Sequence, residues 1–344
     1  MTETRSKILL IYTGGTIGMV RDDEQGNLKA FNFSQLLSKI PEIKLLEHEI
    51  ETISFENPLD SSDFGTKEYQ KLAQIIFDNY QDYDGFVVLH GSDTMSYSAS
   101  VLSFMLENLS KPIIFTGSQL PIGDLRTDAK ENLISSIQIA GLKQNGKPVI
   151  KEVGLYFEYK LYRANRTTKA SAEHFEAFDS PNYPPLIQSG VNLNINYAAI
   201  KKIRKEKKLV LHTDLEDKIL LLKLFPGLDE TVFKALLEIP HIKGIILESF
   251  GSGNFKTADW FLEGVRRKIE QSIPVINITQ CIGGRVQMGK YETSQKLKTI
   301  GVISGKDMTT ETAVAKMMYL LPKRLSMKVF KTIFETSLRG EISD

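Results

Sequence analysis

A run of two threonines and two glycines, Thr13–Thr16, closes the first apolar stretch of the sequence. Its glycines permit a tight turn and a close approach of the backbone to a ligand, and its amides could hold an anion or a developing oxyanion. The segment is neither a G-x-G-x-x-G dinucleotide fingerprint nor a phosphate loop, which would end in Gly-Lys-Ser/Thr. Taken alone, it could equally be a plain turn out of a strand.

A second polar cluster, His90–Thr94 (HGSDT), ends a later apolar run and leads into a helical pattern. Helix capping is the commoner role for such hydroxyls and carboxylates. What favours a chemical role for this cluster is Lys169, in the stretch Asn165–Lys169, because a lysine there could reach the same edge. A desolvated lysine could take a proton from a hydroxyl while a nearby aspartate holds it in place, although an isolated lysine is more often solvated.

A third cluster, Asp60–Asp63 (DSSD), precedes another helical pattern. It could be a turn that leads into this helix. It could also bind the ammonium and carboxylate of an amino acid, because that task needs one acidic acceptor and several donors. The residues alone leave both interpretations open.

Four short apolar runs in the first half of the chain are typical of strands buried on both faces. They are Lys7–Thr13, Gly85–His90, Pro112–Thr116 and Lys151–Phe157. Helical patterns at Tyr69–Ile76 and Ala99–Leu109 separate them, which predicts a parallel sheet with flanking helices. The carboxyl ends of such strands share one edge, so the segments that follow the runs should converge there. Those segments are residues 13–18, 90–94, 116–119 and 162–169.

A second α/β series follows a break in this pattern near Ser180. Its apolar runs are Lys218–Phe225, Lys243–Glu248 and Pro274–Thr279, with helical patterns from Asp229, Thr257 and Thr309. The polar stretch before it ends in a basic run, KKIRKEKK. The sequence therefore predicts a larger amino-terminal α/β domain (1–192), a linker (193–212) and a smaller carboxyl-terminal α/β domain (213–344).

The composition is that of an ordinary globular protein, with 42% hydrophobic and 25% charged residues. A formal net charge of +1 gives no field for nucleic acid or an anionic membrane, and a basic run in a linker is usually a solvated face. The start of the chain lacks a signal-peptide pattern and Cys281 is the single cysteine, so we expect a cytoplasmic protein. We expect no cofactor and no metal.

The motifs together resemble type I L-asparaginases, the cytoplasmic bacterial kind, over almost the whole chain. The matching segments are Thr13–Met19, Asp60–Asp63, Asp84–Met95, Leu102–Leu109, Tyr162–Lys169 and Thr279–Tyr291. The resemblance implies that a threonine hydroxyl attacks the amide carbon of asparagine, ammonia leaves, and water hydrolyses the acyl-enzyme. It maps the nucleophile to Thr16 and a hydroxyl, lysine and aspartate relay to Ser92, Lys169 and Asp93.

The resemblance also implies a set of residues that bind the substrate, in addition to Ser92 and Asp93. These are Gly15, Asp60, Ser61, Ser118 and Tyr291. Backbone amides near Gly15 and Ser92 would stabilise the oxyanion. Family members assemble as dimers or tetramers, so the partners implied are asparagine and further copies of the chain.

The sequence departs from the family at two places near the predicted site. The relay hydroxyl is usually a threonine, and Ser92 lacks its methyl, which leaves one rotor less restrained. The loop Val20–Ala30 contains none of the tyrosines that many relatives place there, and Asn27 stands at the matching position. Tyr291 matches a tyrosine that reaches the active site of a neighbouring subunit, and could supply the missing phenol.

Some type I enzymes have a second asparagine site that activates them. The matching residues here are Thr168, Glu248, Asn254 and Cys281. A relative has arginine where this chain has Glu248, and a carboxylate there would repel the effector's own carboxylate. This substitution argues against an effector site.

Two alternatives to a specific asparaginase remain at this stage. One is an amidohydrolase that also accepts glutamine, because one methylene in a pocket discriminates by only ~1–3 kcal/mol. The other is a catalytically silent amino-acid sensor on the same fold. The hydroxyls and Lys169 argue against the sensor, since binding alone does not need them.

Overall fold

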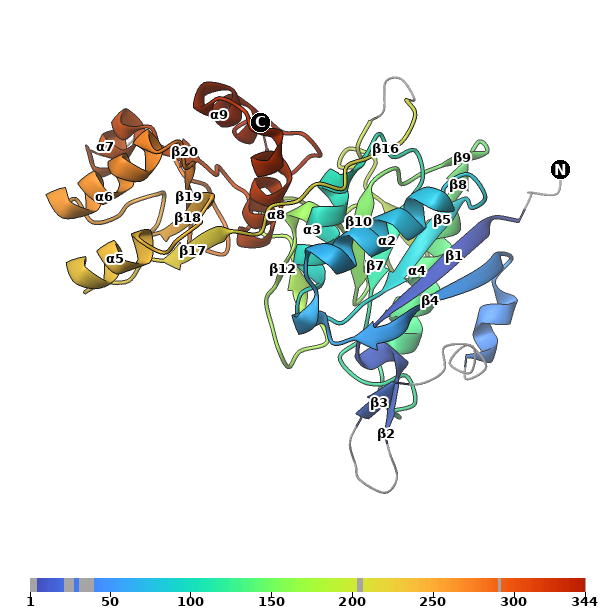
Figure 1. Cartoon of the computed structure of the whole chain (residues 1–344). Helices are drawn as coiled ribbons and strands as arrows, with labels where there is room; N and C mark the ends of the chain where they lie inside the picture. Colours follow the sequence, from blue (N-terminus) through green and yellow to red (C-terminus); the bar gives the residue numbers. More distant parts are fainter. Residues whose placement is uncertain (1–4, 22–27, 31–39, 203–206, 290–291, 344) are drawn as a thin grey trace. The chain divides into compact units, whose positions relative to one another are not determined.

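The computed structural model describes residues 5–21, 28–30, 40–202, 207–289 and 292–343 (Figure 1). The chain divides into two compact units, Met1–Thr213 and Asp214–Asp344. Each unit is built around its own sheet. No helix in the described parts of the chain has the length and apolarity that a membrane crossing requires.

Unit 1 contains an eight-stranded sheet in the order β15-β14-β11-β10-β7-β5-β1-β4. Five neighbouring strands are parallel: β4 (Glu49–Leu59), β1 (Lys7–Gly14), β5 (Gly85–Leu89), β7 (Ile113–Thr116) and β10 (Val153–Phe157). Three antiparallel strands extend the sheet: β11 (Lys160–Arg163), β14 (Ile187–Ser189) and β15 (Leu193–Ile195).

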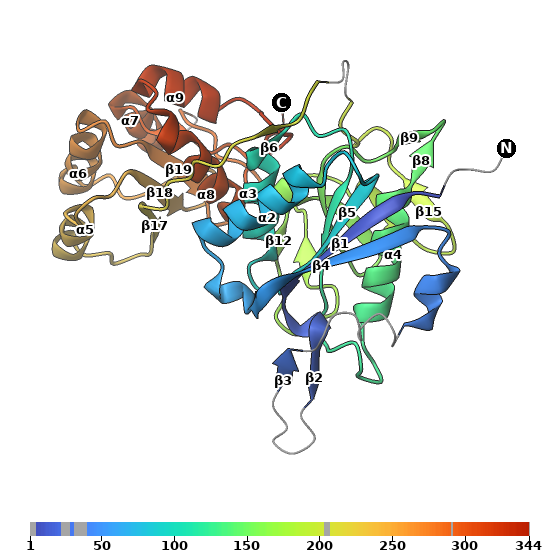
Figure 2. The same ribbon diagram turned by 45° about the vertical axis from the view of Figure 1, so that its right-hand side comes forward.

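Helices cover both faces of this sheet, which is why its central strands read as unbroken apolar runs. Helices α2 (Thr66–Asp78) and α3 (Met95–Met105) lie on one face and α4 (Ala129–Gly141) on the other (Figures 1 and 2). The α4 side forms a continuous core in which Leu133 and Ile137 pack with alternate residues of β1 and β5. The predicted α/β fold of this half is confirmed.

Two elements of unit 1 differ from the sequence prediction. Strand β4 was not expected, because its inward and outward positions alternate without the continuous apolar run of a central strand. The helix expected to reach Leu109 ends at Met105. The chain enters the short strand β6 (Leu106–Glu107) instead, which pairs with β16 (Val210–Leu211), and Asn108 has a left-handed backbone with φ 68°.

The order of the parallel strands creates a switch point between β1 and β5. From β1 the chain goes outward to β4, then returns by α2 to β5 on the other side of β1. Connections therefore leave the carboxyl ends of β1 and β5 in opposite directions and open a crevice there, which is where open α/β sheets bind ligands. Thr16 follows β1 and Ser92 follows β5.

Unit 2 is a smaller α/β body with four parallel strands in the order β17-β18-β19-β20. Their bounds are Ile219–Lys223, Gly244–Ser249, Val275–Thr279 and Ile303–Ser304. Its helices are α5 (Glu230–Leu237), α6 (Asp259–Glu270), α7 (Glu292–Ile300), α8 (Thr310–Leu320) and α9 (Met327–Phe334). Asp229 and Thr309 cap α5 and α8 with their side chains, as the sequence pattern indicates.

Short elements complete the chain. They are β2 (Met19–Arg21), β3 (Leu28–Ala30), β8 (Lys143–Gln144), β9 (Lys147–Pro148), β12 (Thr168–Lys169) and β13 (Phe178–Asp179). Single 3-10 turns occur at η1 (Thr16–Gly18), η2 (Pro41–Leu45), η3 (Ser61–Asp63), η4 (Ala164–Arg166) and η5 (Leu321–Lys323). Three of these turns, η1, η3 and η4, lie in the segments that carry the candidate site residues.

Candidate active site

Glycines bring the loops after β1, β4 and β5 into backbone contact. Gly15 has φ 90°, and a Cβ on it would lie 2.5 Å from Gly91 N. A Cβ on Gly91 would in turn lie 2.7 Å from Ser61 Oγ. Only a residue without a side chain permits these approaches. The two glycines therefore allow Thr16, Ser61 and the His90–Thr94 loop to lie beside one another.

The two threonines of the first loop have different surroundings. Thr13 is completely buried, and its hydroxyl donates to Leu89 O at 2.9 Å, which ties the end of β1 to the end of β5. Thr16 is partly exposed and begins the turn η1. Of the two hydroxyls, that of Thr16 is the one a ligand can reach.

Ser92, Asp93 and Lys169 form a connected polar group at this edge. Lys169 Nζ donates to Ser92 Oγ at 2.9 Å and to Asp93 Oδ1 at 2.5 Å. The lysine side chain is 17% exposed and the Asp93 side chain 64%. A lysine is thus held between a hydroxyl and a carboxylate, which is an arrangement that can move a proton to or from the hydroxyl.

Lys169 reaches the edge by a route that differs from the expected one. Residues 162–169 were expected to follow a fourth parallel strand directly. Tyr162 and Arg163 instead lie in β11, which runs antiparallel to β10. The chain then passes along α3 through η4, where Ser96 Oγ and Thr167 Oγ1 are 2.9 Å apart, before Lys169 meets Ser92.

The Asp60–Asp63 segment is a turn, but it is also part of the edge. The Asp60 carboxylate accepts from Ser62 N at 2.8 Å and so caps η3. Ser61 is buried beneath Gly91, and its carbonyl accepts from Thr94 Oγ1 at 2.6 Å. Thr94 therefore joins two loops instead of capping α3, where its side chain makes no capping bond.

The loop after β7 supplies Ser118 and Gln119. Ser118 is buried and its hydroxyl donates to Leu120 O at 2.6 Å, so it shapes its own loop. Gln119 contacts the polar group directly, because Ser92 Oγ donates to its Oε1 at 3.2 Å. Sequence reasoning missed Gln119 as a site residue, although it belongs to the 116–119 segment expected at this edge.

His90 supports the loop from within the core. Its ring lies against Phe64 and Phe115, with centroids 4.4 Å and 5.9 Å away, and its Nδ1 donates to Gly91 O at 2.8 Å. Complete burial lowers its pKa to about 4, so the ring is neutral at pH 7. A neutral ring with that bond fixes the backbone just before Ser92.

The residues matched to an effector site come from both units of the chain. Thr168 belongs to unit 1, whereas Glu248, Asn254 and Cys281 belong to unit 2. The Glu248 carboxylate accepts from Thr310 Oγ1 at 2.5 Å, and Cys281 is exposed. Tyr291 and Asn27 lie outside the described residues. No His, Cys, Asp or Glu group in the described ranges could hold a metal ion.

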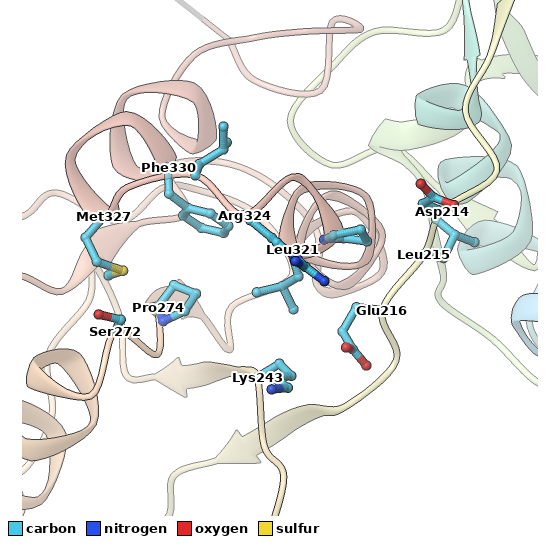
Figure 3. Close-up of a pocket in the computed structure, with 12 residues that line it drawn as sticks. Asp214, Leu215, Glu216, Lys243, Ser272, Pro274, Leu321, Arg324, Met327 and Phe330 are labelled. Atoms are coloured by element: carbon cyan, nitrogen blue, oxygen red, sulfur yellow. The ribbon is translucent and has the colours of Figure 1, made fainter.

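Unit 2 also contains a cavity of about 520 Å³ at the amino ends of its strands (Figure 3). Met327, Phe330 and Pro274 form an apolar side, and the charged Lys243 and Glu216 lie away from it. None of the candidate site residues lines this cavity. It also lies at the opposite end of the strands from the one where parallel sheets bind ligands.

Comparison with known proteins finds a matching family model for each unit. Residues 7–201 match the model for "Asparaginase, N-terminal", and residues 218–334 match that for "Glutaminase/Asparaginase C-terminal domain". The chain is 41% identical to L-asparaginase 1 of Escherichia coli (strain K12), with 98% of each chain covered.

Two further relatives differ in how much of their length is matched. The crystal structure of L-asparaginase I from Vibrio cholerae has a TM-score of 0.89 and 38% identity, covering 99% of this chain and 100% of that one. The chain is also 38% identical to the 60 kDa lysophospholipase of Mus musculus, with 98% of this chain and 62% of that protein covered. The likeness thus extends over both units.

Proposed function

This chain belongs to the asparaginase family of amidohydrolases, and from that premise we propose that it hydrolyses L-asparagine to aspartate and ammonia with Thr16 as the nucleophile. The observation that carries the proposal is the contact of Lys169 Nζ with both Ser92 Oγ and Asp93 Oδ1. Amino-acid binding alone needs no lysine bonded to a hydroxyl. The silent-sensor alternative is therefore not favoured.

The reaction takes two steps. The Thr16 oxygen attacks the amide carbon, its proton passes to the departing nitrogen, the C–N bond breaks and ammonia leaves. Water then attacks the Thr16 ester, releases aspartate and returns a proton to the Thr16 oxygen. Lys169 moves protons through Ser92 in these steps, and Asp93 holds the lysine in place.

The same edge provides for substrate binding and for the developing charge. Backbone amides near Gly15 and Ser92 stabilise the oxyanion. The close packing of Gly15 on Gly91 supports this assignment, because it brings the two loops together. Asp60 and Asp93 are the carboxylates available for the α-ammonium group, while Ser61 donates to the α-carboxylate. Ser118 orders the loop after β7 through its hydrogen bond to Leu120 O. Tyr291 is a further residue of the proposed substrate-binding set.

The experiment that tests the nucleophile is Thr16→Ala. Ammonia release from asparagine should be abolished, while asparagine binding should change by less than about tenfold, which is ~1.4 kcal/mol. The matched control is Thr13→Val, which removes the buried hydroxyl three residues away and should leave turnover within about tenfold. Unchanged turnover in Thr16→Ala would refute the mechanism.

Substrate range is tested on the same wild-type protein. Ammonia release from asparagine and from glutamine should differ by the factor of about 10 to 200 that one methylene supplies. A lysophospholipid belongs in the panel because of the name of the mouse relative, and we expect no turnover of it. The asparagine curve should be hyperbolic, since Glu248 argues against an activating site, and a sigmoidal curve would contradict this.

We further propose a cytoplasmic homodimer or homotetramer. The single cysteine, Cys281, fits a reducing compartment. The oligomeric state is tested by light scattering on the purified chain, where a monomer at micromolar concentration would contradict it.

We also propose that residues 193–212 form the linker between the two domains. Limited proteolysis tests this boundary, and it should cut within this range before any other.

A further inference from the structure

Gln119 makes a hydrogen bond with the relay hydroxyl whose direction the surroundings define. Its Nε2 lies 3.3 Å from Ala172 O and 3.1 Å from His174 O, and carbonyl oxygens can only accept. The amide nitrogen must therefore face the two carbonyls, and Oε1 must face Ser92. It follows that Ser92 donates its hydroxyl proton to Gln119 and accepts from Lys169.

Ser92 needs such a partner more than a β-branched residue would. A serine side chain has one heavy atom on Cβ, so its χ1 is less restricted than that of threonine. The bonds to Gln119 and Lys169 select one rotamer and one direction for the hydroxyl proton. In that state a lone pair of Oγ points to the lysine.

Gln119 is itself held firmly on its backbone side. The Asp128 carboxylate accepts from Gln119 N at 2.9 Å and 3.1 Å and from Leu120 N at 3.2 Å. Asp128 is 5% exposed and also accepts from Asn132 Nδ2 at 3.1 Å, whose amide donates as well to Gly117 O. A side chain with an anchored backbone can hold its partner in place at little further cost in entropy.

We propose that Gln119 is a positioning residue that sets the rotamer and the proton direction of Ser92. This inference rests on the proposed function, because it assigns a role within the same relay. Gln119 takes up no proton: it holds the Ser92 hydroxyl before the reaction, and the Ser92 proton turns away from Gln119 when it is passed on. It keeps Ser92 oriented toward Lys169, and it connects the relay hydroxyl to the segment at Ala172 and His174.

The test is a double-mutant cycle in steady-state ammonia release from asparagine. Gln119→Leu should lower kcat by at least about tenfold and change KM by less than about threefold, because orientation is lost while substrate contacts are kept. In the background of Ser92→Thr, where the methyl restricts χ1, the same substitution should lower kcat by less than about threefold. Gln119→Met is a second variant with nearly the length of glutamine and only a weak thioether acceptor, and it should lower kcat in the same direction.

The matched control is Gln70→Leu, which removes another glutamine bond to a carbonyl, that of Nε2 to Thr213 O at 2.9 Å. It should leave kcat at the wild-type value. An unchanged kcat in Gln119→Leu, or an equal loss in both backgrounds, would overturn the positioning role. An inactive wild type, or a fully active Ser92→Ala, would instead overturn the proposed function, so the two failures are distinguishable.

Discussion

Two lysine–carboxylate pairs, one in each unit, have nearly equal contact distances in opposite surroundings. Lys169 Nζ lies 2.5 Å from Asp93 Oδ1, with side-chain exposures of 17% and 64%. Lys316 Nζ lies 2.6 Å from Glu341 Oε1, and both side chains are completely buried. The distance between the charges therefore does not separate a pair that we propose to take part in the reaction from a pair that belongs to a buried structural network.

The number and kind of partners separate the pairs. Lys316 has three acceptors for its three N–H donors, since Phe334 O at 2.8 Å and Thr336 O at 2.6 Å join Glu341. Glu341 also accepts from the amides of Leu338 and Arg339. This network fixes the last residues of the chain. Burial lowers the pKa of Lys316, and the Glu341 charge opposes that effect.

Lys169 is bonded to a group that can exchange a proton. Among the residues that the structure describes, Lys169 Nζ donates to the Ser92 hydroxyl and to one oxygen of an exposed carboxylate. Water and substrate can reach such a pair, and the carboxylate is not needed to compensate a buried charge. We infer that Lys169 contributes to turnover and little to stability, whereas Lys316 does the reverse.

The largest expected effect is the loss of activity in Lys169→Met. Ammonia release should fall by about 10³-fold, because a positioned acid or base contributes about 10²–10⁴-fold. The free energy of unfolding in urea should change by less than about 1 kcal/mol, because the exposed Asp93 carboxylate stays hydrated when Lys169 is removed. Lys160→Met, which removes another partly exposed lysine near Glu176, is the control and should keep full activity. Wild-type turnover in Lys169→Met would end the comparison.

The next effect concerns stability. Lys316→Met should lower the free energy of unfolding by about 3–5 kcal/mol, because Glu341 would remain buried without its partner. Turnover per folded molecule should stay at the wild-type value. The double variant Lys316→Met with Glu341→Gln removes both charges but keeps an acceptor for the amides of Leu338 and Arg339, and should recover most of the loss. A single variant as stable as the wild type, or a double variant that recovers nothing, would contradict the structural role of this pair.

The sequence predicted the parts of the candidate site that depend on parallel strands. Thr16 and Ser92 follow buried apolar runs, and the carboxyl ends of such strands necessarily meet at one edge. The sequence pattern predicted a close approach of the backbone at Gly15 but not at Gly91. Their mutual contact depends on the register of β1 with β5, which no local pattern specifies.

The remaining parts depend on tertiary contacts. The antiparallel return through β11 was not predicted, because Lys160–Arg163 is short and carries a charge at each end, and the turn before it, at Glu158 and Tyr159, has no glycine. Glu158 and Tyr159 adopt left-handed φ angles of 41° and 67° there, which such residues seldom do. The contact of Gln119 with Ala172 O joins residues 53 positions apart in the sequence, which no local pattern indicates.

The smallest effect concerns His90, the buried titratable group in unit 1 whose hydrogen bond to Gly91 O holds the backbone just before Ser92. Burial lowers its pKa from 6.5 to about 4, so protonation favours the unfolded chain. Its contribution to stability is complete above pH 6.5 and is lost as the pH falls toward 4. Between pH 7 and pH 4.5 the wild type should lose about 2 kcal/mol more unfolding free energy than His90→Asn. His174→Asn, at an exposed histidine, should follow the wild-type curve. Parallel curves for wild type and His90→Asn would mean that His90 is not held neutral, and that the Ser92 loop lacks this support.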